Sequence, residues 1–216
     1  MVYQIIDPET NKWNTYVPNK KVIYIISHGF NGNTHILNKL GYKVYHIYIK
    51  EYDKYPENWQ TQQWMNTKFR TKPYFNLESL VDNVVFYQIK DLISRGEGPC
   101  AILTGSRGGQ VTLSRLWNFW KGPSVCLNAG CIFNSITDTK NIPLGLITGS
   151  KDFFRTKNIE FTSNKFNKWK GPLYIYHNTE DDHTMKYYNE AIVYLLNKLL
   201  NKNIKLNFSK NAVVYE

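Results

Sequence analysis

The chain has 216 residues, 42% of them hydrophobic, which suits one domain with a sizeable core and excludes a disordered protein. It has no apolar run long enough to span a bilayer and no signal-peptide pattern at its start, so we expect a cytoplasmic protein without a membrane span. The formal net charge of +10 is scattered rather than gathered in a basic block, and the codon usage of an AT-rich genome explains it at least as well as nucleic-acid binding does.

The first half of the chain alternates predicted strands and helices. Two short opening strands, Met1–Ile6 and Trp13–Val17, are joined by a turn and are expected to form an antiparallel edge. Val22–Ser27 is a continuous β-branched and aromatic run, which is typical of a strand buried on both faces. The elements expected next are a helix over Thr34–Leu40, a strand over Tyr42–Ile49, a helix over Asn76–Ser94 and a strand over Cys100–Leu103.

The second half continues the alternation. Apolar residues at helical spacing predict a helix over Arg107–Trp120. Further expected elements are strands over Ser124–Leu127, Pro143–Thr148 and Leu173–Tyr176, a helix over Thr184–Asn201, and an ambiguous tail, Ile204–Glu216, as a candidate edge strand. The order predicts a single α/β domain over residues 1–216, a three-layer α/β/α sandwich with a mostly parallel sheet.

The best candidate for chemistry follows the apolar run Ala101–Leu103. The run stops at Ser106, which is preceded by Thr104 and Gly105 and followed by Arg107, Gly108 and Gly109. A nucleophile held on a sharp turn between strand and helix needs small neighbours, because the turn is strained and the backbones crowd together. The pattern predicts that Ser106 is a nucleophile.

A glycine-containing loop, residues 27–32, follows the first buried strand. Gly29 would let the chain turn closely, so that the backbone N–H of Phe30 points toward a developing oxyanion. The N–H of Arg107, directly after the nucleophile, would be the second donor. The alternative interpretation is an ordinary strand-to-helix loop of the kind any α/β fold contains.

An acid and a base follow later strands. Asp152 lies just past one predicted strand, and His183 lies in a polar loop at the entry to the last helix. An aspartate can orient a histidine that acts as general base toward a serine. Taken singly, each residue also fits a surface turn, and Asp181-Asp182-His183 could suggest a metal site. We expect no metal, because no other ligand cluster is visible.

Ser106, Asp152 and His183 occur in a workable order, each after a separate predicted strand, and the carboxyl ends of parallel strands converge in space. Here the chain resembles the α/β-hydrolase superfamily, with Thr104 in a position more often held by glycine. The resemblance implies a roughly eight-stranded sheet and a Ser-His-Asp mechanism without a cofactor. It does not imply a substrate, because this fold carries many functions.

The material that relatives use as a lid is short here, and the extra residues lie in 50–75. This aromatic-rich segment is either a cap over the site or a surface helix packed on the core. The tentative substrate pocket comprises His28, Trp59, Trp64 and Phe153. Arg107 is a further candidate for contact with a substrate anion.

Three functions follow, in order of preference. The first is a cofactor-independent serine hydrolase that cleaves an ester, thioester or amide of a small to medium acyl substrate. The second is a catalytically silent binding module with the same fold, and the third a basic nucleic-acid-binding protein. Cys100 and Cys126 lie at or in apolar runs and are expected to be reduced, buried thiols.

Overall fold

The computed structural model describes residues 2–7, 9–28, 34–47, 84–106, 116–128, 142–152 and 169–216. Of residues 27, 28 and 106 it describes the backbone alone. Within these ranges no helix is long and apolar enough to cross a membrane.

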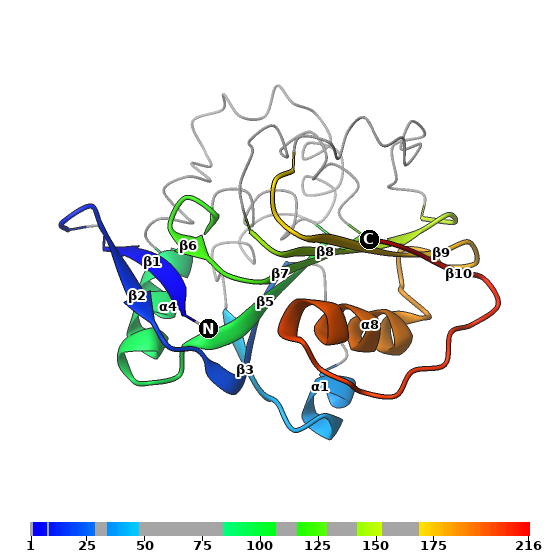
Figure 1. The fold of residues 1–216 in the computed structure, drawn as a ribbon, viewed down its shortest axis with the longest axis horizontal. Helices are drawn as coiled ribbons and strands as arrows, with labels where there is room; N and C mark the ends of the chain where they lie inside the picture. Colours follow the sequence, from blue (N-terminus) through cyan, green and yellow to red (C-terminus); the bar gives the residue numbers. More distant parts are fainter. Residues whose placement is uncertain are drawn as a thin grey trace.

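A seven-stranded sheet forms the centre of the described structure (Figure 1). Its order is β10-β9-β8-β7-β5-β3-β4, and every neighbouring pair is parallel except β9 with β10. The strands are β3 (Asn19–His28), β4 (Lys43–Ile47), β5 (Pro99–Ser106), β7 (Ser124–Leu127), β8 (Leu144–Gly149), β9 (Leu173–Asn178) and β10 (Ala212–Tyr215). The predicted mostly parallel α/β sheet is confirmed, and the tail adds the expected edge strand.

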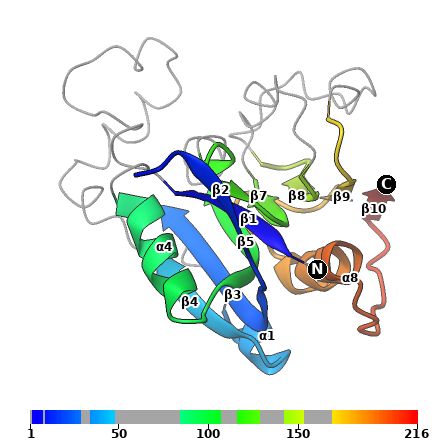
Figure 2. The same cartoon turned by 60° about the vertical axis from the view of Figure 1, so that its left-hand side comes forward.

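Helices cover both faces of this sheet, as its continuous apolar strands require (Figure 2). One face of the sheet packs against α4 (Phe86–Ser94) and is called the α4 face below. The other packs against α1 (His35–Lys39) and α8 (Tyr188–Leu200) and is called the α8 face. Side chains alternate along β3, so that Tyr24 and Ile26 lie on the α4 face and Ile23 and Ile25 on the α8 face. All four are fully buried, which explains the unbroken apolar run in the sequence.

The expected position of the opening strands is wrong. β1 (Tyr3–Asp7) and β2 (Lys12–Tyr16) pair with each other, but they form a separate three-stranded sheet with β6 (Trp120–Lys121) instead of an edge of the main sheet. β6 supplies the outer partner of β1, and buried Trp120 packs in the core beneath.

The helical spacing also predicts Trp120 at the end of a helix, which is wrong, because Trp120 begins β6. Leu116 is still helical, but the chain turns at 117–119, where the N–H of Phe119 bonds the carbonyl of Leu116. Gly122 then leaves room for the Trp120 ring, which lies 2.4 Å from where a Cβ at this glycine would stand. The periodicity at Trp120 reflects burial, which a strand can satisfy as well as a helix.

The last helix begins later than predicted, at Tyr188 instead of Thr184. Residues 182–185 form turns, because the Asp182 carboxylate accepts hydrogen bonds from Thr184 and Met185 adopts a left-handed φ of 57°. Asn201 ends the helix in the left-handed conformation that suits this position.

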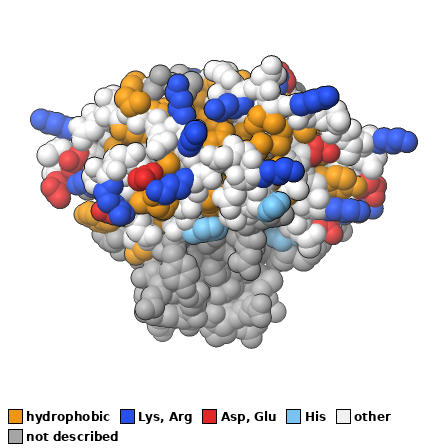
Figure 3. Space-filling model, turned by 90° about the horizontal axis from the view of Figure 1, so that it is seen from below, with side chains coloured by type: hydrophobic (Ala, Val, Ile, Leu, Met, Phe, Trp, Pro, Cys, Tyr) orange, Lys and Arg blue, Asp and Glu red, His pale blue; other side chains and the backbone are white. Residues whose placement is uncertain are grey.

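Cys100 and Cys126 are buried free thiols, as expected. Burial raises the pKa of Cys100 to about 11 and that of Cys126 to about 12, so both stay protonated and unreactive at neutral pH. Figure 3 views the molecule from the side of α1 and α8. Lys and Arg side chains are spread across this face among apolar and uncharged ones, in keeping with their scatter along the sequence.

The Tyr16 hydroxyl joins the small sheet to the main one, and its removal should destabilise the fold. It accepts a hydrogen bond from Nε1 of buried Trp120 at 2.6 Å and donates one to the carbonyl of Pro99 at 3.2 Å. Tyr16→Phe leaves the indole N–H without this acceptor, so urea unfolding should show a loss of about 1–3 kcal/mol. Tyr87→Phe, at an exposed position, should change stability by less than about 0.5 kcal/mol. Equal effects would contradict this linking role.

Candidate active site

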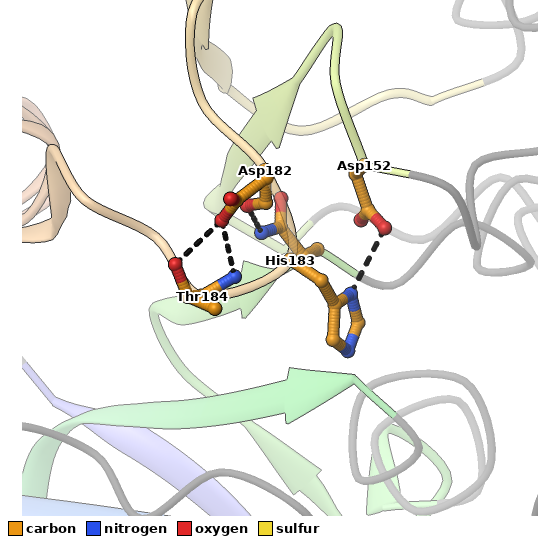
Figure 4. Close-up of polar contacts among 5 residues, drawn as sticks. Asp152, Asp182, His183 and Thr184 are labelled. Carbon is orange, nitrogen blue, oxygen red and sulfur yellow. Dashed lines mark hydrogen bonds and ion pairs between the residues drawn. The ribbon is translucent and has the colours of Figure 1, made fainter.

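The structure brings the predicted acid and base together. Asp152 lies three residues beyond the end of β8, and His183 five residues beyond the end of β9. Nδ1 of His183 and Oδ1 of Asp152 are 3.0 Å apart (Figure 4). The Asp152 side chain is 4% exposed and that of His183 22%. A buried carboxylate at Nδ1 holds the imidazole with its proton on that nitrogen and leaves Nε2 as the basic atom.

Ser106 ends β5 at the same edge of the sheet. β5, β8 and β9 are parallel, so their carboxyl ends meet at one edge, with β7 between β5 and β8. Because the Ser106 side chain is outside the described part, its contact with His183 stays a prediction. The backbone of Ser106 pairs with that of His28 in β3.

The small residues before Ser106 have a visible packing reason. Thr104 and Gly105 are buried in β5, which lies between β3 and β7. The Thr104 hydroxyl donates a hydrogen bond to the carbonyl of Val125 at 3.2 Å, which satisfies its one buried polar atom. Threonine therefore fits this position, although the sequence resemblance assigns glycine to it more often.

Several predicted site residues lie outside the described residues. They are the oxyanion donors Phe30 and Arg107, the pocket residues Trp59, Trp64 and Phe153, and the whole proposed cap at 50–75. The backbone of His28 is described as the last residue of β3. Catalytic and pocket roles for these residues stay predictions.

Hydrogen bonds between backbones join the turn after β8 to the loop after β9. The N–H of Ser150 bonds the carbonyl of Asn178 at 3.1 Å, and the N–H of Lys151 bonds the carbonyl of Asp181 at 2.9 Å. On the surface beside these hydrogen bonds, Lys151 and Glu180 form an ion pair. Asp152 and His183 are thus carried by two segments that are bonded to each other, which sequence reasoning did not anticipate.

Gly149 is the reason these segments can come so close. A Cβ at Gly149 would lie 2.2 Å from the carbonyl oxygen of Asp181 and 2.6 Å from its carbonyl carbon. Only glycine permits backbone to approach at this distance. In the sequence Gly149 lies between a predicted strand and a polar turn. Its contact with Asp181, 32 residues later, could not be predicted from any local pattern.

Asn128, directly after β7, supports the loop between β9 and α8, residues 179–187, which carries His183 and is called the histidine loop below. Its side-chain Nδ2 donates to the carbonyl of Asp182 at 3.0 Å, and its own N–H bonds the carbonyl of Ile147 at 2.9 Å. The residue has a φ of 44°, a left-handed conformation that asparagine tolerates better than most side chains. A lone Asn after a strand usually indicates a turn, which is why this role was missed.

The two aspartates before His183 differ in environment. Asp182 accepts hydrogen bonds from the N–H and hydroxyl of Thr184, at 2.7 and 2.5 Å, and these bonds lower its pKa (Figure 4). Asp181 is fully buried, and neither carboxylate oxygen has a hydrogen-bond partner among the described residues. Burial raises the pKa of Asp181, although the nearby N–H groups of Lys186 and Tyr187 oppose this. Among the described residues, no three His, Cys, Asp or Glu side chains are grouped to hold a metal.

No family model and no curated protein sequence matches this chain. Its structure is similar to that of an alpha-beta serine hydrolase homologue from Coxiella burnetii, with a TM-score of 0.56 and 12% identity over 93% of this chain and 96% of that one. It is also similar to the esterase domain of a Rhodothermus marinus protein, with a TM-score of 0.51 and 13% identity over 90% of this chain and 94% of that one. The chain therefore has the α/β-hydrolase fold, as the sequence resemblance predicted.

Replacing Gly149 should separate the two loops. In Gly149→Ala the new methyl meets backbone atoms that cannot rotate away, so we expect a loss of about 2 kcal/mol or more in urea unfolding. Gly145→Ala, in the same strand, is the matched control: its Cβ would meet methyl groups of Leu195 and Leu199 at 3.0–3.1 Å, which is a milder contact with side chains instead of backbone, so its loss should be smaller. Similar losses in both variants would show that the Gly149–Asp181 approach is not special.

The aspartates should give opposite pH dependences of stability. Because the folded-state pKa of Asp181 is raised, the wild type loses stability as pH rises above the ordinary aspartate value. Asp181→Asn should therefore gain in stability relative to wild type as pH rises above about 4, the ordinary aspartate pKa. Asp182 has a lowered pKa, so Asp182→Asn should lose stability relative to wild type as pH rises toward about 4, the ordinary aspartate pKa. Urea unfolding across pH measures both, and differences that do not change with pH would contradict these environments.

Proposed function

We propose that this protein is a serine hydrolase that cleaves an ester, or a thioester or amide, of a small to medium acyl substrate. The observation that carries the proposal is the 3.0 Å contact between His183 Nδ1 and the buried Asp152 carboxylate, at the sheet edge where β5 delivers Ser106. The α/β-hydrolase fold supports it, and the similar structures include an esterase domain and a serine hydrolase homologue.

In the proposed mechanism, Nε2 of His183 removes the proton of the Ser106 hydroxyl as its oxygen attacks the substrate carbonyl. Asp152 keeps the proton of His183 on Nδ1 and stabilises the imidazolium that forms. The N–H groups of Phe30 and Arg107 would bind the oxyanion. His183 then protonates the leaving group, and a water activated by His183 releases the acyl group from Ser106.

An ester is the preferred substrate, because its alkoxide leaving group needs less protonation than an amine. Chemistry at a serine, a histidine and an aspartate needs no cofactor. The aromatic segment 50–75 is our candidate for the acyl pocket, with Trp59 and Trp64 as its proposed contacts.

Covalent labelling tests the nucleophile. A fluorophosphonate should label the wild type and Ser94→Ala, a control on the exposed end of α4, but not Ser106→Ala. Asp152→Asn should retain Ser106 but react about 10³–10⁴ times more slowly with a short-chain nitrophenyl ester, because His183 loses the acceptor that sets its tautomer. Equal labelling of wild type and Ser106→Ala would overturn the proposal. Binding of an acyl ligand without Ser106-dependent turnover would favour the silent binding module.

A further inference from the structure

A second histidine lies beside the Asp152 turn and has no part in the proposed mechanism. His177, in β9, is 6% exposed. Its Nδ1 is 2.7 Å from the Thr148 hydroxyl and its Nε2 is 2.9 Å from the Ser150 hydroxyl. One imidazole thus bridges two side chains at the end of β8, directly before the turn that carries Asp152.

The sheet geometry explains how one ring reaches both hydroxyls. Thr148 and His177 are register partners on neighbouring strands, and residues two apart in a strand point to the same face. Thr148 and Ser150 therefore extend toward the α4 face, where alternation also places His177, because Ile175 packs there.

Gly149, between the two hydroxyl residues, faces the opposite way, against the Asp181 backbone. The end of β8 is thus held from both sides: by the His177 ring on the α4 face and by the histidine loop on the α8 face. Asp152 is two residues past Ser150, and its N–H is directed back to the carbonyl of Gly149 at 3.4 Å. Because only Lys151 lies between Ser150 and Asp152, the position of the Asp152 carboxylate depends closely on how the end of β8 is held.

The chemistry of the contacts requires no charge. A neutral imidazole donates from one nitrogen and accepts at the other, and a hydroxyl can do either. The contacts with Thr148 and Ser150 are therefore satisfied with the ring neutral, which suits the burial of the ring.

We propose that His177 is a positioning residue for the Asp152–His183 pair. By bridging Thr148 and Ser150, it fixes the turn after β8 and so holds the Asp152 carboxylate against Nδ1 of His183. The proposal deepens the proposed function and depends on it for any effect on catalysis. When the bridge is removed, Asp152 shifts, the Nδ1–H form of His183 loses its preference, and a fraction of His183 carries its proton on Nε2. That fraction cannot accept a proton from Ser106.

The test measures the His183 tautomer by side-chain ¹⁵N NMR at a pH where the ring is neutral. The wild type should show the Nδ1–H form. Thr148→Val, which removes one hydroxyl at constant shape, and His177→Phe, which removes both contacts, should each show a mixture with the Nε2–H form. In nitrophenyl ester turnover, kcat should fall about 10- to 100-fold while KM changes little, because the loss is of alignment and not of substrate binding.

Two controls separate positioning from a general loss of packing. Thr148→Ser keeps the hydroxyl and should restore both the wild-type tautomer and kcat. Ile175→Val, a buried neighbour of His177 on the α4 face, should lower stability without changing either. If His177→Phe does not fold, the tautomer of His183 is measured in Thr148→Val alone.

A pure Nδ1–H form of His183 in folded Thr148→Val would overturn the proposal, and so would a mixed form in Ile175→Val. The NMR result needs no turnover. Failure of the nucleophile, seen as labelling of Ser106→Ala, is therefore distinguishable from failure of the His177 role.

Discussion

The contact between His183 and Asp152 depends on a close approach of two backbones. The turn after β8 and the loop after β9 meet where Gly149 has no side chain, and the hydrogen bond from Lys151 to the carbonyl of Asp181 closes the junction. A side chain at this point would separate the segments and, with them, the imidazole and the carboxylate. The candidate site is thus built on backbone packing before any catalytic side chain is considered.

The two segments that meet here carry three aspartates in different environments. Asp152 and Asp181 are both buried, whereas Asp182 is at the surface with its own hydrogen bonds from Thr184. The Asp152 carboxylate has His183 as a partner, but the pKa of Asp181 is raised by its burial. The loop that carries the proposed base therefore also holds, two residues before it, a buried carboxylate that has no hydrogen-bond partner among the described residues.

Local patterns in the sequence were sufficient to predict the main sheet and the contact between Asp152 and His183. Val22–Ser27 reads as a buried strand because parallel strands covered on both faces must be apolar throughout, and the structure has it inside β3. Asp152 and His183 were found because parallel strands bring their carboxyl ends to one edge. The place of the opening hairpin could not be predicted from local patterns, because β6, which pairs with β1, is more than 100 residues away and has only two residues. The secondary structure at Trp120 was mispredicted because burial of a tryptophan does not distinguish a helix from a strand.

The sequence by itself determined the α/β class, the alternation of strands and helices, and the residues from which an acid and a base could be drawn. These follow from periodicity and from the few residue types that suit each chemistry. Only the tertiary structure decided that Gly149 faces the Asp181 backbone, that Asn128 supports the Asp182 carbonyl, and that His177 bridges Thr148 and Ser150. Each of these contacts joins segments far apart in the chain, and the distance and direction between such segments are set by packing, for which no local pattern exists.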